Sequence, residues 1–385
     1  MTVAATGWFG PRIAAPARQG ARRRSSSFPR TVRTLLWILI LFVGAEIGLR
    51  LRAWHRHGSN APVANIYNPD PVLGRRLRGG ATLEGSRRQV SINSLGFRGP
   101  EIAILKPPGT VRIAVLGDST VFGLEASCDA AVWVERMVAR LRESGSGGGF
   151  DAINAGVPGY TLAVSAEQLT RDIAPIEPDV VIVNQLTADI AAHSRRQFRS
   201  VALSSDSPSS LTKFLEGHSV LVNVFRQNTT ALTAKFIPHR RQDRLDDRGF
   251  AEYADRLAHV VDTCRSRGWR IVLATCPRSF GDPSSSTDQH VLAATALANN
   301  PSLSLKGLND AFDRYNEVIR RTARTHGVAI VDLDRLVPRG DRYFVDAVHL
   351  NDAGHDLVGR LIAEALLDGV FDEALALGVR RLGIP

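Results

Sequence analysis

The sequence predicts an α/β protein: a three-layer α/β/α sandwich on a five-stranded parallel sheet, preceded by one N-terminal transmembrane helix. Two observations predict this fold class. Five short apolar runs alternate with helical patterns after residue 109, and strands joined through helices pair in parallel by right-handed crossovers. An apolar segment also stands near the N-terminus. At 385 residues and 44% hydrophobic composition, the chain is long enough to bury such a core.

The positive charge is concentrated at the N-terminus. The formal net charge is +10, and residues 1–60 hold ten arginines and one acid, Glu46, so the rest is about neutral. A basic tail before an apolar run indicates a topogenic signal. Because no basic patch interleaved with aromatics follows, we expect no nucleic-acid partner. Residues 1–33, rich in Arg, Ala, Ser and Pro, predict a disordered basic cytoplasmic tail.

The apolar run Leu35–Leu49 predicts a transmembrane signal anchor over residues 34–50. The run is short for a bilayer, which needs roughly 17 to 25 residues, but flanking arginines lengthen the span by snorkelling. Glu46 would then lie near the outer interface, where a charge costs less. A cleaved signal peptide is the alternative, and the arginines after the run disfavour it. The positive-inside rule predicts a cytoplasmic N-terminus and a periplasmic or extracellular main domain.

The remaining chain divides by composition and periodicity. Residues 51–108 predict a linker and leader segment, in which 90–98 form a short strand and turn that docks on another part. Residues 109–370 predict the main domain, and 371–385 a C-terminal tail. Strands are expected at 112–116, 150–154, 179–183, 270–274 and 328–332. Helices are expected at 130–142, 164–173, 253–264 and 308–325, and from the N-cap Asn351 to about 367. Two polar insertions, 195–246 and 278–305, are expected as loops or short helices over the sheet edge.

The cysteines indicate no covalent framework. Cys128, Cys264 and Cys276 are odd in number and lack CxxC or Cys/His spacing, so we expect core thiols, no disulfide framework and no metal. If the domain lies outside the cytoplasm, a disulfide between Cys264 and Cys276 is an alternative.

Gly117-Asp118-Ser119 follows the first expected strand, so its serine leaves the sheet at the edge where ligands bind. The glycine permits close backbone approach, and the serine N–H is left to point at an oxyanion. Alone, this tripeptide is also a common turn or N-cap sequence.

Asp346-Ala-Val-His349 supplies a second signal just ahead of the last expected helix. The spacing lets the carboxylate orient the imidazole while the ring takes a proton from a hydroxyl nucleophile. Both signals fall where an active site of this architecture lies. Together they predict a Ser–His–Asp site.

These residues resemble the SGNH/GDSL hydrolase family over roughly residues 112–367. The first block corresponds to residues 117–119, the second to Asn154-Ala-Gly156 with Gly159 following, and the last to Asp346 and His349. Residues 350–355, and 93–101 as a leader of membrane-anchored members, are also similar. The resemblance implies the flavodoxin-like SGNH fold and no cofactor. It implies these roles: nucleophile Ser119, base His349, orienter Asp346, and oxyanion donors on the backbone of Ser119 and Gly156.

The third block departs from the family pattern Gly-x-Asn-Asp. Leu186 stands at the Gly position, Ala188 at the Asn position and Asp189 at the Asp position. Alanine has no donor for the oxyanion, and losing one such donor typically lowers the rate about 10²- to 10³-fold. Three outcomes are open: a slow enzyme, a lost activity, or a rearranged oxyanion hole. In a rearranged hole, Asn184, Gln185 or Thr187 would supply the missing donor.

Other polar and aromatic residues are interpreted as structural. We expect Asp118 and Asp189 to support loops through hydrogen bonds, and Asn184 to be a strand residue. Trp133 is expected to pack a helix on the sheet, and Arg98 to form an ion pair. Surface positions are expected for three histidines without metal-ligand spacing, His193, His218 and His290.

The sequence therefore predicts a serine ester hydrolase acting on O-acyl groups, such as acetyl groups of envelope or exported carbohydrate. Its expected partners are a small-molecule or carbohydrate ester and the membrane, through residues 34–50. Two alternatives are open. One is an O-acyltransferase with the same triad, in which a sugar hydroxyl replaces water. The other is a catalytically disabled SGNH-fold binding or assembly protein, which Ala188 favours.

Overall fold

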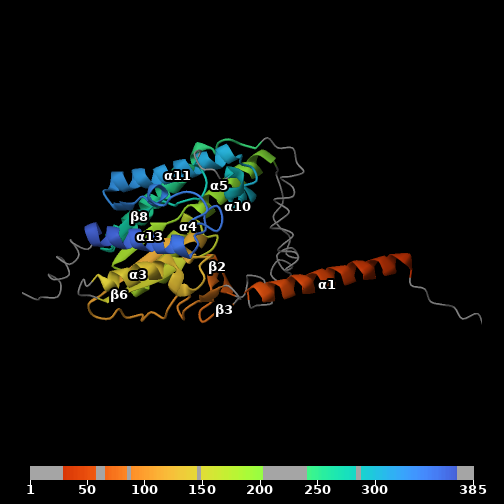
Figure 1. The fold of residues 1–385 in the computed structure, drawn as a ribbon, viewed down its shortest axis with the longest axis horizontal. Helices are drawn as coiled ribbons and strands as arrows, with labels where there is room; N and C mark the ends of the chain where they lie inside the picture. Colours follow the sequence, from red (N-terminus) through yellow and green to blue (C-terminus); the bar gives the residue numbers. More distant parts are fainter. Residues whose placement is uncertain are drawn as a thin grey trace, which may run out of the picture. The chain divides into compact units, whose positions relative to one another are not determined.

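The computed structural model describes residues 29–57, 66–84, 88–144, 149–202, 241–282 and 288–370 (Figure 1). By internal contacts the chain divides into two units, Met1–Ala45 and Glu46–Pro385. Most of the expected basic tail and the C-terminal tail lie outside the described residues.

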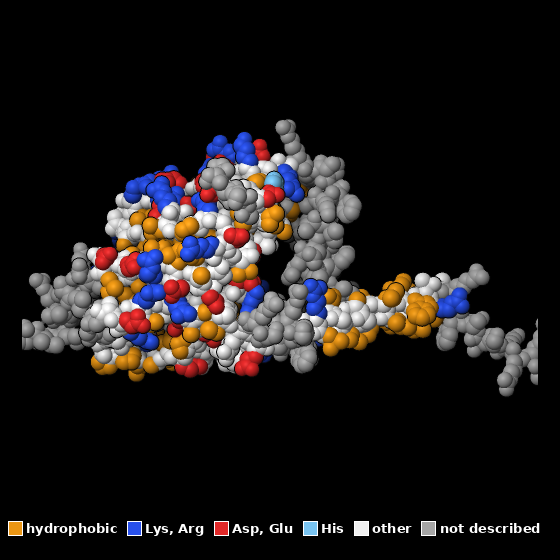
Figure 2. Space-filling model, in the orientation of Figure 1, with side chains coloured by type: hydrophobic (Ala, Val, Ile, Leu, Met, Phe, Trp, Pro, Cys, Tyr) orange, Lys and Arg blue, Asp and Glu red, His pale blue; other side chains and the backbone are white. Residues whose placement is uncertain are grey.

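Helix α1 (Arg30–His57) contains the expected membrane segment. Its stretch Thr31–Arg52 has 22 residues and a mean hydropathy of 2.0, which is long and apolar enough to cross a membrane. A signal sequence near the N-terminus has the same properties. Within the helix, Arg50 donates to Glu46 at 2.8 Å, so the acid of the apolar run is paired. Figure 2 shows hydrophobic side chains along this helix.

The five-stranded parallel sheet is confirmed, with the strand order β6-β5-β7-β8-β9. Its strands are β5 (Thr110–Gly117), β6 (Gly149–Gly156), β7 (Val180–Asn184), β8 (Arg270–Ala274) and β9 (Ala329–Val331). The first strand in the chain lies between the second and the third. This reversal of strand order is the topological switch point, beside which open α/β sheets bind ligands at the carboxyl ends of their strands.

Five of the described helices lie close to the expected ranges, whereas a sixth, α5 (Thr187–Ala202), was not expected as a helix. The long ones are α3 (Trp133–Glu143), α4 (Leu162–Gln168), α5 (Thr187–Ala202), α8 (Asp247–Ser266), α11 (Leu305–His326) and α13 (Asp352–Ala365). Short helices are α2 (Ser119–Phe122), α9 (Gln289–Leu292), α10 (Ala294–Asn299) and α12 (Leu333–Leu336). The expected N-cap is confirmed, since Asn351 accepts a hydrogen bond from the N–H of Gly354 at 2.9 Å.

Alternation along the strands makes the three layers. In β5, Ile113 and Val115 belong to a buried cluster with α3 and α13, whereas Ala114 and Leu116 join a cluster with α4, α8 and α11. Figure 1 shows α3 and α13 on one side and α11 on the other. Residues of β7 and β8 divide between the same two clusters, so the sheet is buried on both faces, as parallel sheets require.

Within the expected linker and leader segment, the described residues 66–84 and 88–101 are folded. Two hairpins form there, β1 (Tyr67–Asp70) with β2 (Gly74–Leu77) and β3 (Thr82–Glu84) with β4 (Gln89–Ser91). Strand β4 falls at the short strand expected within 90–98, whereas the other three were missed because each has only three or four residues. Docking is confirmed: leader side chains share a buried cluster with α2 and with the loop after β6. Arg98 also forms an antiparallel bridge with Asn154 of β6.

Candidate active site

Ser119 leaves the sheet at a sharp strand-to-helix turn. β5 ends at Gly117, and Asp118 caps α2 by accepting the N–H of Thr120 at 3.0 Å. A Cβ on Gly117 would lie 2.1 Å from the side chain of Val121, so no larger residue fits. The turn therefore places Ser119 at the carboxyl edge of a central strand.

Asp346 and His349 lie on a tight turn ahead of α13. Phe344 and Leu350 pair across its base, and the N–H of Val345 donates to the His349 carbonyl at 2.8 Å. Asp346 Oδ1 accepts the N–H of His349 itself at 2.9 Å. The backbone thus fixes the carboxylate and the ring within one turn.

The structure brings the three residues of the expected triad together across 230 positions of sequence. His349 Nε2 lies 2.8 Å from Ser119 Oγ, and His349 Nδ1 lies 2.9 Å from Asp346 Oδ2. Both distances are those of hydrogen bonds between a nucleophile, a base and the group that orients the base. The arrangement is able to move the Ser119 proton onto the ring.

The electrostatics of the pair suit a base. Burial of the His349 ring lowers its pKa, but the hydrogen bond to Asp346 and the negative charge of that carboxylate outweigh it, so the pKa is raised above 6.5. For Asp346 the directions are reversed. Burial raises its pKa, but the hydrogen bonds from His349 and the backbone outweigh burial, so the pKa is lowered below 3.8. Asp346 therefore stays ionised and holds the proton of Nδ1 in place.

The backbone donors near Ser119 are unequal. The Ser119 N–H donates no hydrogen bond to any described residue. The Gly156 N–H, expected as the second oxyanion donor, instead donates to Asn154 Oδ1 at 3.1 Å. A Cβ on Gly156 would lie 2.3 Å from the Phe122 nitrogen, so this glycine is needed for packing against α2. Gly159, with φ of 82°, has an N–H without an acceptor among the described residues.

The third block offers none of the three side chains considered as a substitute for the missing asparagine. The Asn184 amide donates to the Thr275 carbonyl at 3.0 Å, in line with its expected place on a strand. Gln185 donates to the Tyr160 carbonyl at 2.7 Å. Thr187 donates to Asp118 Oδ2. Each of these three side-chain donors already has an acceptor within the protein.

Asp118 and Asp189 tie the loops of the site together. Asp118 Oδ2 accepts the N–H of Ala188 at 3.1 Å, which fastens the third block to the turn that carries the nucleophile. Both oxygens of Asp189 accept the N–H of Leu162, at 3.1 and 3.0 Å, at the start of α4. Asp189 is 7% exposed, and this burial raises its pKa to about 7.

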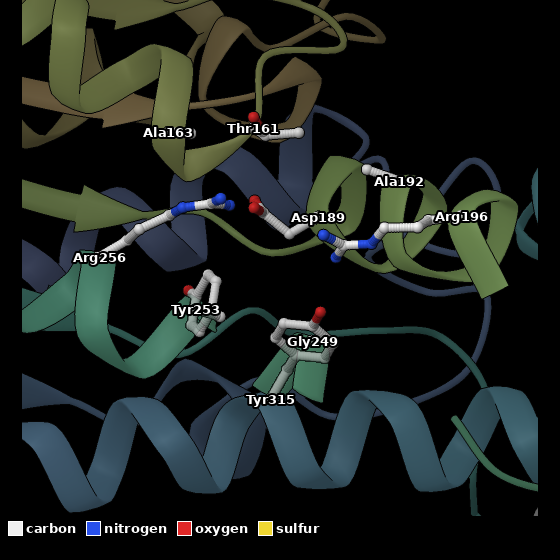
Figure 3. A pocket seen from close by; sticks show the side chains of 9 residues that line it. All are labelled: Thr161, Ala163, Asp189, Ala192, Arg196, Gly249, Tyr253, Arg256 and Tyr315. Atoms are coloured by element: carbon white, nitrogen blue, oxygen red, sulfur yellow. The ribbon is translucent and has the colours of Figure 1, made fainter. Parts of the chain in front are cut away.

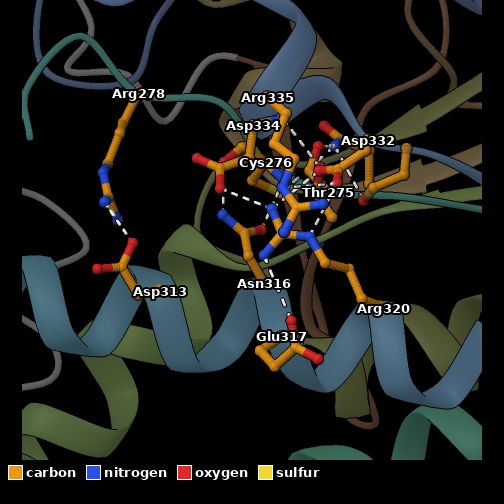
Figure 4. Close-up of polar contacts among 12 residues, drawn as sticks. Thr275, Cys276, Arg278, Asp313, Asn316, Glu317, Arg320, Asp332, Asp334 and Arg335 are labelled. Carbon is orange, nitrogen blue, oxygen red and sulfur yellow. Dashed lines mark hydrogen bonds and ion pairs between the residues drawn. The ribbon is translucent and has the colours of Figure 1, made fainter. Parts of the chain in front are cut away.

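An ion-pair network at the carboxyl ends of β8 and β9 holds the loops that follow them (Figure 4). Arg320 of α11 donates to Asp332 at 2.9 Å and to Asp334 at 2.8 Å. The Thr275 hydroxyl donates to Asp332 at 2.8 Å and accepts the Asp334 N–H at 2.9 Å. One helix is thereby joined to two loops.

The network reaches the turn that carries the base. Arg339 donates to Asp334 and to the Phe280 carbonyl, both at 2.9 Å. The neighbouring Ser279 donates its N–H to the Ala347 carbonyl at 2.9 Å. Ala347 lies inside the Asp346–His349 turn, so the loop after β8 braces the candidate base.

Arg98 and Trp133 fulfil their expected structural roles. Arg98 is 2% exposed and its Nε donates to Asp129 at 2.8 Å. Trp133 is buried in the cluster between α3 and the sheet. Asp129 was missed as an organising residue, because a short polar residue in a turn carries no periodic signal.

The surface position expected for His193 was wrong. The ring is 1% exposed, with Nε2 3.0 Å from Asp246 and Nδ1 3.1 Å from the Tyr315 hydroxyl. These partners are 53 and 122 positions away, so no local pattern reveals them. His290 is exposed, as expected, and His218 lies outside the described residues.

The cysteines are free thiols, and Cys264 and Cys276 are buried as expected for core residues. Cys128 is only partly buried. Within the described part of the chain, no group of three or more His, Cys, Asp or Glu side chains is placed to hold a metal ion.

Fold and site geometry define a class: three-layer α/β/α proteins with a serine, a histidine and an aspartate joined at the sheet edge. Residues 115–357 match the model of the GDSL-like lipase/acylhydrolase family. The chain belongs to this family, and it is an enzyme of the ester-hydrolysing class.

Several solved structures are similar at low identity. A lipase/acylhydrolase from Enterococcus faecalis is 16% identical, with 66% of this chain and 95% of that chain covered and a TM-score of 0.41. A catalytic mutant of the acetylxylan esterase Axe2 from Geobacillus stearothermophilus is 15% identical, with 66% and 94% covered and a TM-score of 0.42. The α/β hydrolase LAE5 from the metagenome of Lake Arreo, Spain, is 16% identical, with 66% and 94% covered and a TM-score of 0.42. A search of the curated proteins finds no match to the chain.

Proposed function

We propose that this chain is a serine ester hydrolase that removes O-acyl groups, acetyl groups of carbohydrate among them. Ser119 is the nucleophile, His349 the base and Asp346 the residue that orients the base. The observation that carries the proposal is the continuous hydrogen-bond path from Ser119 Oγ through the ring to Asp346, with both contacts below 3 Å.

The reaction follows from this path. Ser119 Oγ attacks the ester carbonyl carbon while its proton passes to His349 Nε2. The tetrahedral intermediate collapses, the carbon–oxygen bond to the alcohol breaks, and the alcohol leaves with the proton from Nε2. Water then attacks the acyl-serine, giving one proton to Nε2, and the acid is released as Ser119 regains its proton.

The negative oxygen of the intermediate is held by backbone donors in this account. The Ser119 N–H is one of them, because it donates to no described residue. Gly159 supplies the second donor, because the Gly156 N–H is taken by Asn154. No side-chain amide replaces the family asparagine at Ala188, so the hole has fewer donors than the family pattern.

The location of the domain bears on its substrate. Helix α1 acts as an uncleaved anchor, with the N-terminus in the cytoplasm and the hydrolase domain outside. The single candidate span among the described residues and the arginines that precede it support this topology. Envelope or exported carbohydrate would then be the accessible source of esters.

The test compares the full-length wild type in detergent with Ser119→Ala. The measurement is acid released from a short activated ester and from O-acetylated polysaccharide. Ser266→Ala, on the exposed end of α8, is the matched serine control. We expect activity in wild type and control and a loss of at least about 10³-fold in Ser119→Ala. Equal rates in all three proteins would refute the proposal.

The same assay separates the acyltransferase alternative. With a sugar acceptor present, a hydrolase releases free acid, whereas a transferase accumulates acylated sugar. Acylated sugar without free acid, lost in Ser119→Ala, would replace hydrolysis by transfer at the same site. A background rate in wild type, together with no labelling of Ser119 by a serine-reactive probe, would favour the disabled binding protein.

A further inference from the structure

A pocket lies beside the third block, on the face of the sheet covered by α4, α5, α8 and α11 (Figure 3). Its volume is about 320 Å³, which is enough for a sugar-sized ligand. Thr161 and Asp189 line one side, and Tyr253 and Tyr315 line another. Ser119, Asp346 and His349 are not among its lining residues.

The pocket is separated from Ser119 by the third block itself. Thr187 and Ala188 donate to Asp118, next to the nucleophile, whereas the following residue, Asp189, faces the pocket. A ligand in the pocket would therefore contact the block from the side away from Ser119.

Two arginines give the pocket a positive rim. Figure 3 shows Arg196 of α5 and Arg256 of α8 reaching toward Asp189 from opposite sides. Their nearest carboxylate is Glu252, at 2.7 Å from Arg196 and 3.9 Å from Arg256. Glu252 also pairs with Arg248, at 2.9 Å, so one carboxylate serves three guanidinium groups. Positive charge is therefore in excess beside the pocket.

Asp189 does not balance this excess at neutral pH. The carboxyl group is 7% exposed and both oxygens accept the Leu162 N–H. Burial raises its pKa to about 7, so a large fraction is protonated near pH 7. The interior of the pocket thus offers little negative charge to repel an anion.

The aromatic side is held rigidly. The Tyr253 hydroxyl donates to the Gln185 carbonyl, and the Tyr315 hydroxyl lies 3.1 Å from His193 Nδ1. The two tyrosine rings meet edge to face with centroids 4.9 Å apart. Both tyrosines are only 2% exposed, so their rings form a fixed and almost fully covered wall of the pocket.

We propose that this pocket is a second binding site, which takes a sugar-sized ligand with its carboxylate or phosphate between Arg196 and Arg256. Guanidinium groups recognise both anions through paired hydrogen bonds. Because Ser119 takes no part in this binding site, a test of the site is independent of the proposed hydrolase activity.

Calorimetric titration of the full-length chain in detergent tests the proposal. The probes are D-glucuronate, D-glucose 6-phosphate and, as the neutral counterpart, D-glucose. We expect both charged sugars to bind more tightly than glucose, and the tighter of the two identifies the anion. Equal affinity for all three sugars, or no binding of any of them at millimolar concentration, would overturn the proposal.

Matched variants locate the binding. Arg196→Gln and Arg256→Gln should each weaken the charged sugars about tenfold, because each loses a charge-assisted hydrogen bond. Arg248→Gln, which pairs with the same Glu252 but does not line the pocket, should change affinity less than twofold. Ser119→Ala should bind like wild type. Unchanged affinity in both pocket variants, or a loss in Ser119→Ala, would contradict the assignment.

Discussion

The part of the site that moves a proton and the part that receives negative charge are built differently. In the part that moves a proton, His349 contacts Ser119 through one ring nitrogen and Asp346 through the other. The turn that carries both Asp346 and His349 is held by the hydrogen bond from Ser279 to Ala347. In the part that receives negative charge, the family asparagine is replaced by Ala188, and neighbouring side chains are engaged elsewhere. Under the proposed mechanism, we therefore expect stabilisation of the oxyanion, rather than proton transfer, to limit the rate.

The largest effect is expected from removing the base. His349→Ala should lower kcat about 10⁵-fold, because Ser119 then has no group to accept its proton. The measurement is kcat for a short activated ester, with the exposed His290→Ala as control. A loss smaller than tenfold would mean that His349 is not the base that activates Ser119.

The next effect concerns the carboxylate. Asp346→Asn should lower kcat about 10⁴-fold, as the ring loses the partner that fixes its tautomer. Asp341→Asn, an exposed carboxylate in the preceding loop, is the control.

The pH profile reports on the same contact. The base must be neutral, and its pKa is raised, so wild-type kcat/KM should fall as the pH drops through a value above 6.5. Without Asp346, the largest influences that raise this pKa are lost, and only the charges of Asp118 and Glu125 oppose the effect of burial. The pKa should therefore be lower than in the wild type, and the residual activity should persist to lower pH. If the acid limb of the kcat/KM profile were at the same pH in the wild type and in Asp346→Asn, the result would contradict the pairing of Asp346 with His349.

The oxyanion half should respond in the opposite direction. Ala188→Asn should raise kcat about 10- to 10²-fold, because an amide donor is added where the family pattern has one. Ala192→Asn, one turn further along α5, should not. The gain in kcat must be absent from the double variant that combines Ala188→Asn with Ser119→Ala. A decrease would show that the hole has been rearranged around alanine.

The smallest effect is expected from the bracing network. Arg320→Gln should lower the free energy of unfolding by roughly 2 kcal/mol, since two carboxylates lose their charged donor. It should also lower kcat a few-fold through the turn at Ala347. Arg324→Gln, whose exposed side chain pairs only with Glu317 in the described structure, should change neither. Thermal unfolding and the ester assay together check this.

The sheet, and the proximity of Ser119, His349 and Asp346, were predictable because their signals are local and mutually consistent. In strand β8, Arg270 is followed by a continuous apolar run, and Asp346 and His349 are three positions apart. The environment of His193 was not predictable, because its partners, Asp246 at the N-cap of α8 and Tyr315 of α11, are far away in the sequence. Likewise, only packing shows that Gly156 is needed against α2 and that its N–H is taken.

Trapping the acyl-enzyme tests the central claim most directly. Wild type, Ser119→Ala and His349→Ala are mixed with an activated acetyl ester, quenched in acid and analysed by peptide mass spectrometry. The account predicts one acetyl group on the peptide containing Ser119 in wild type, formed far more slowly in His349→Ala and absent from Ser119→Ala. Turnover of the ester without any acetyl group on that peptide, or an equal adduct in all three proteins, would contradict it.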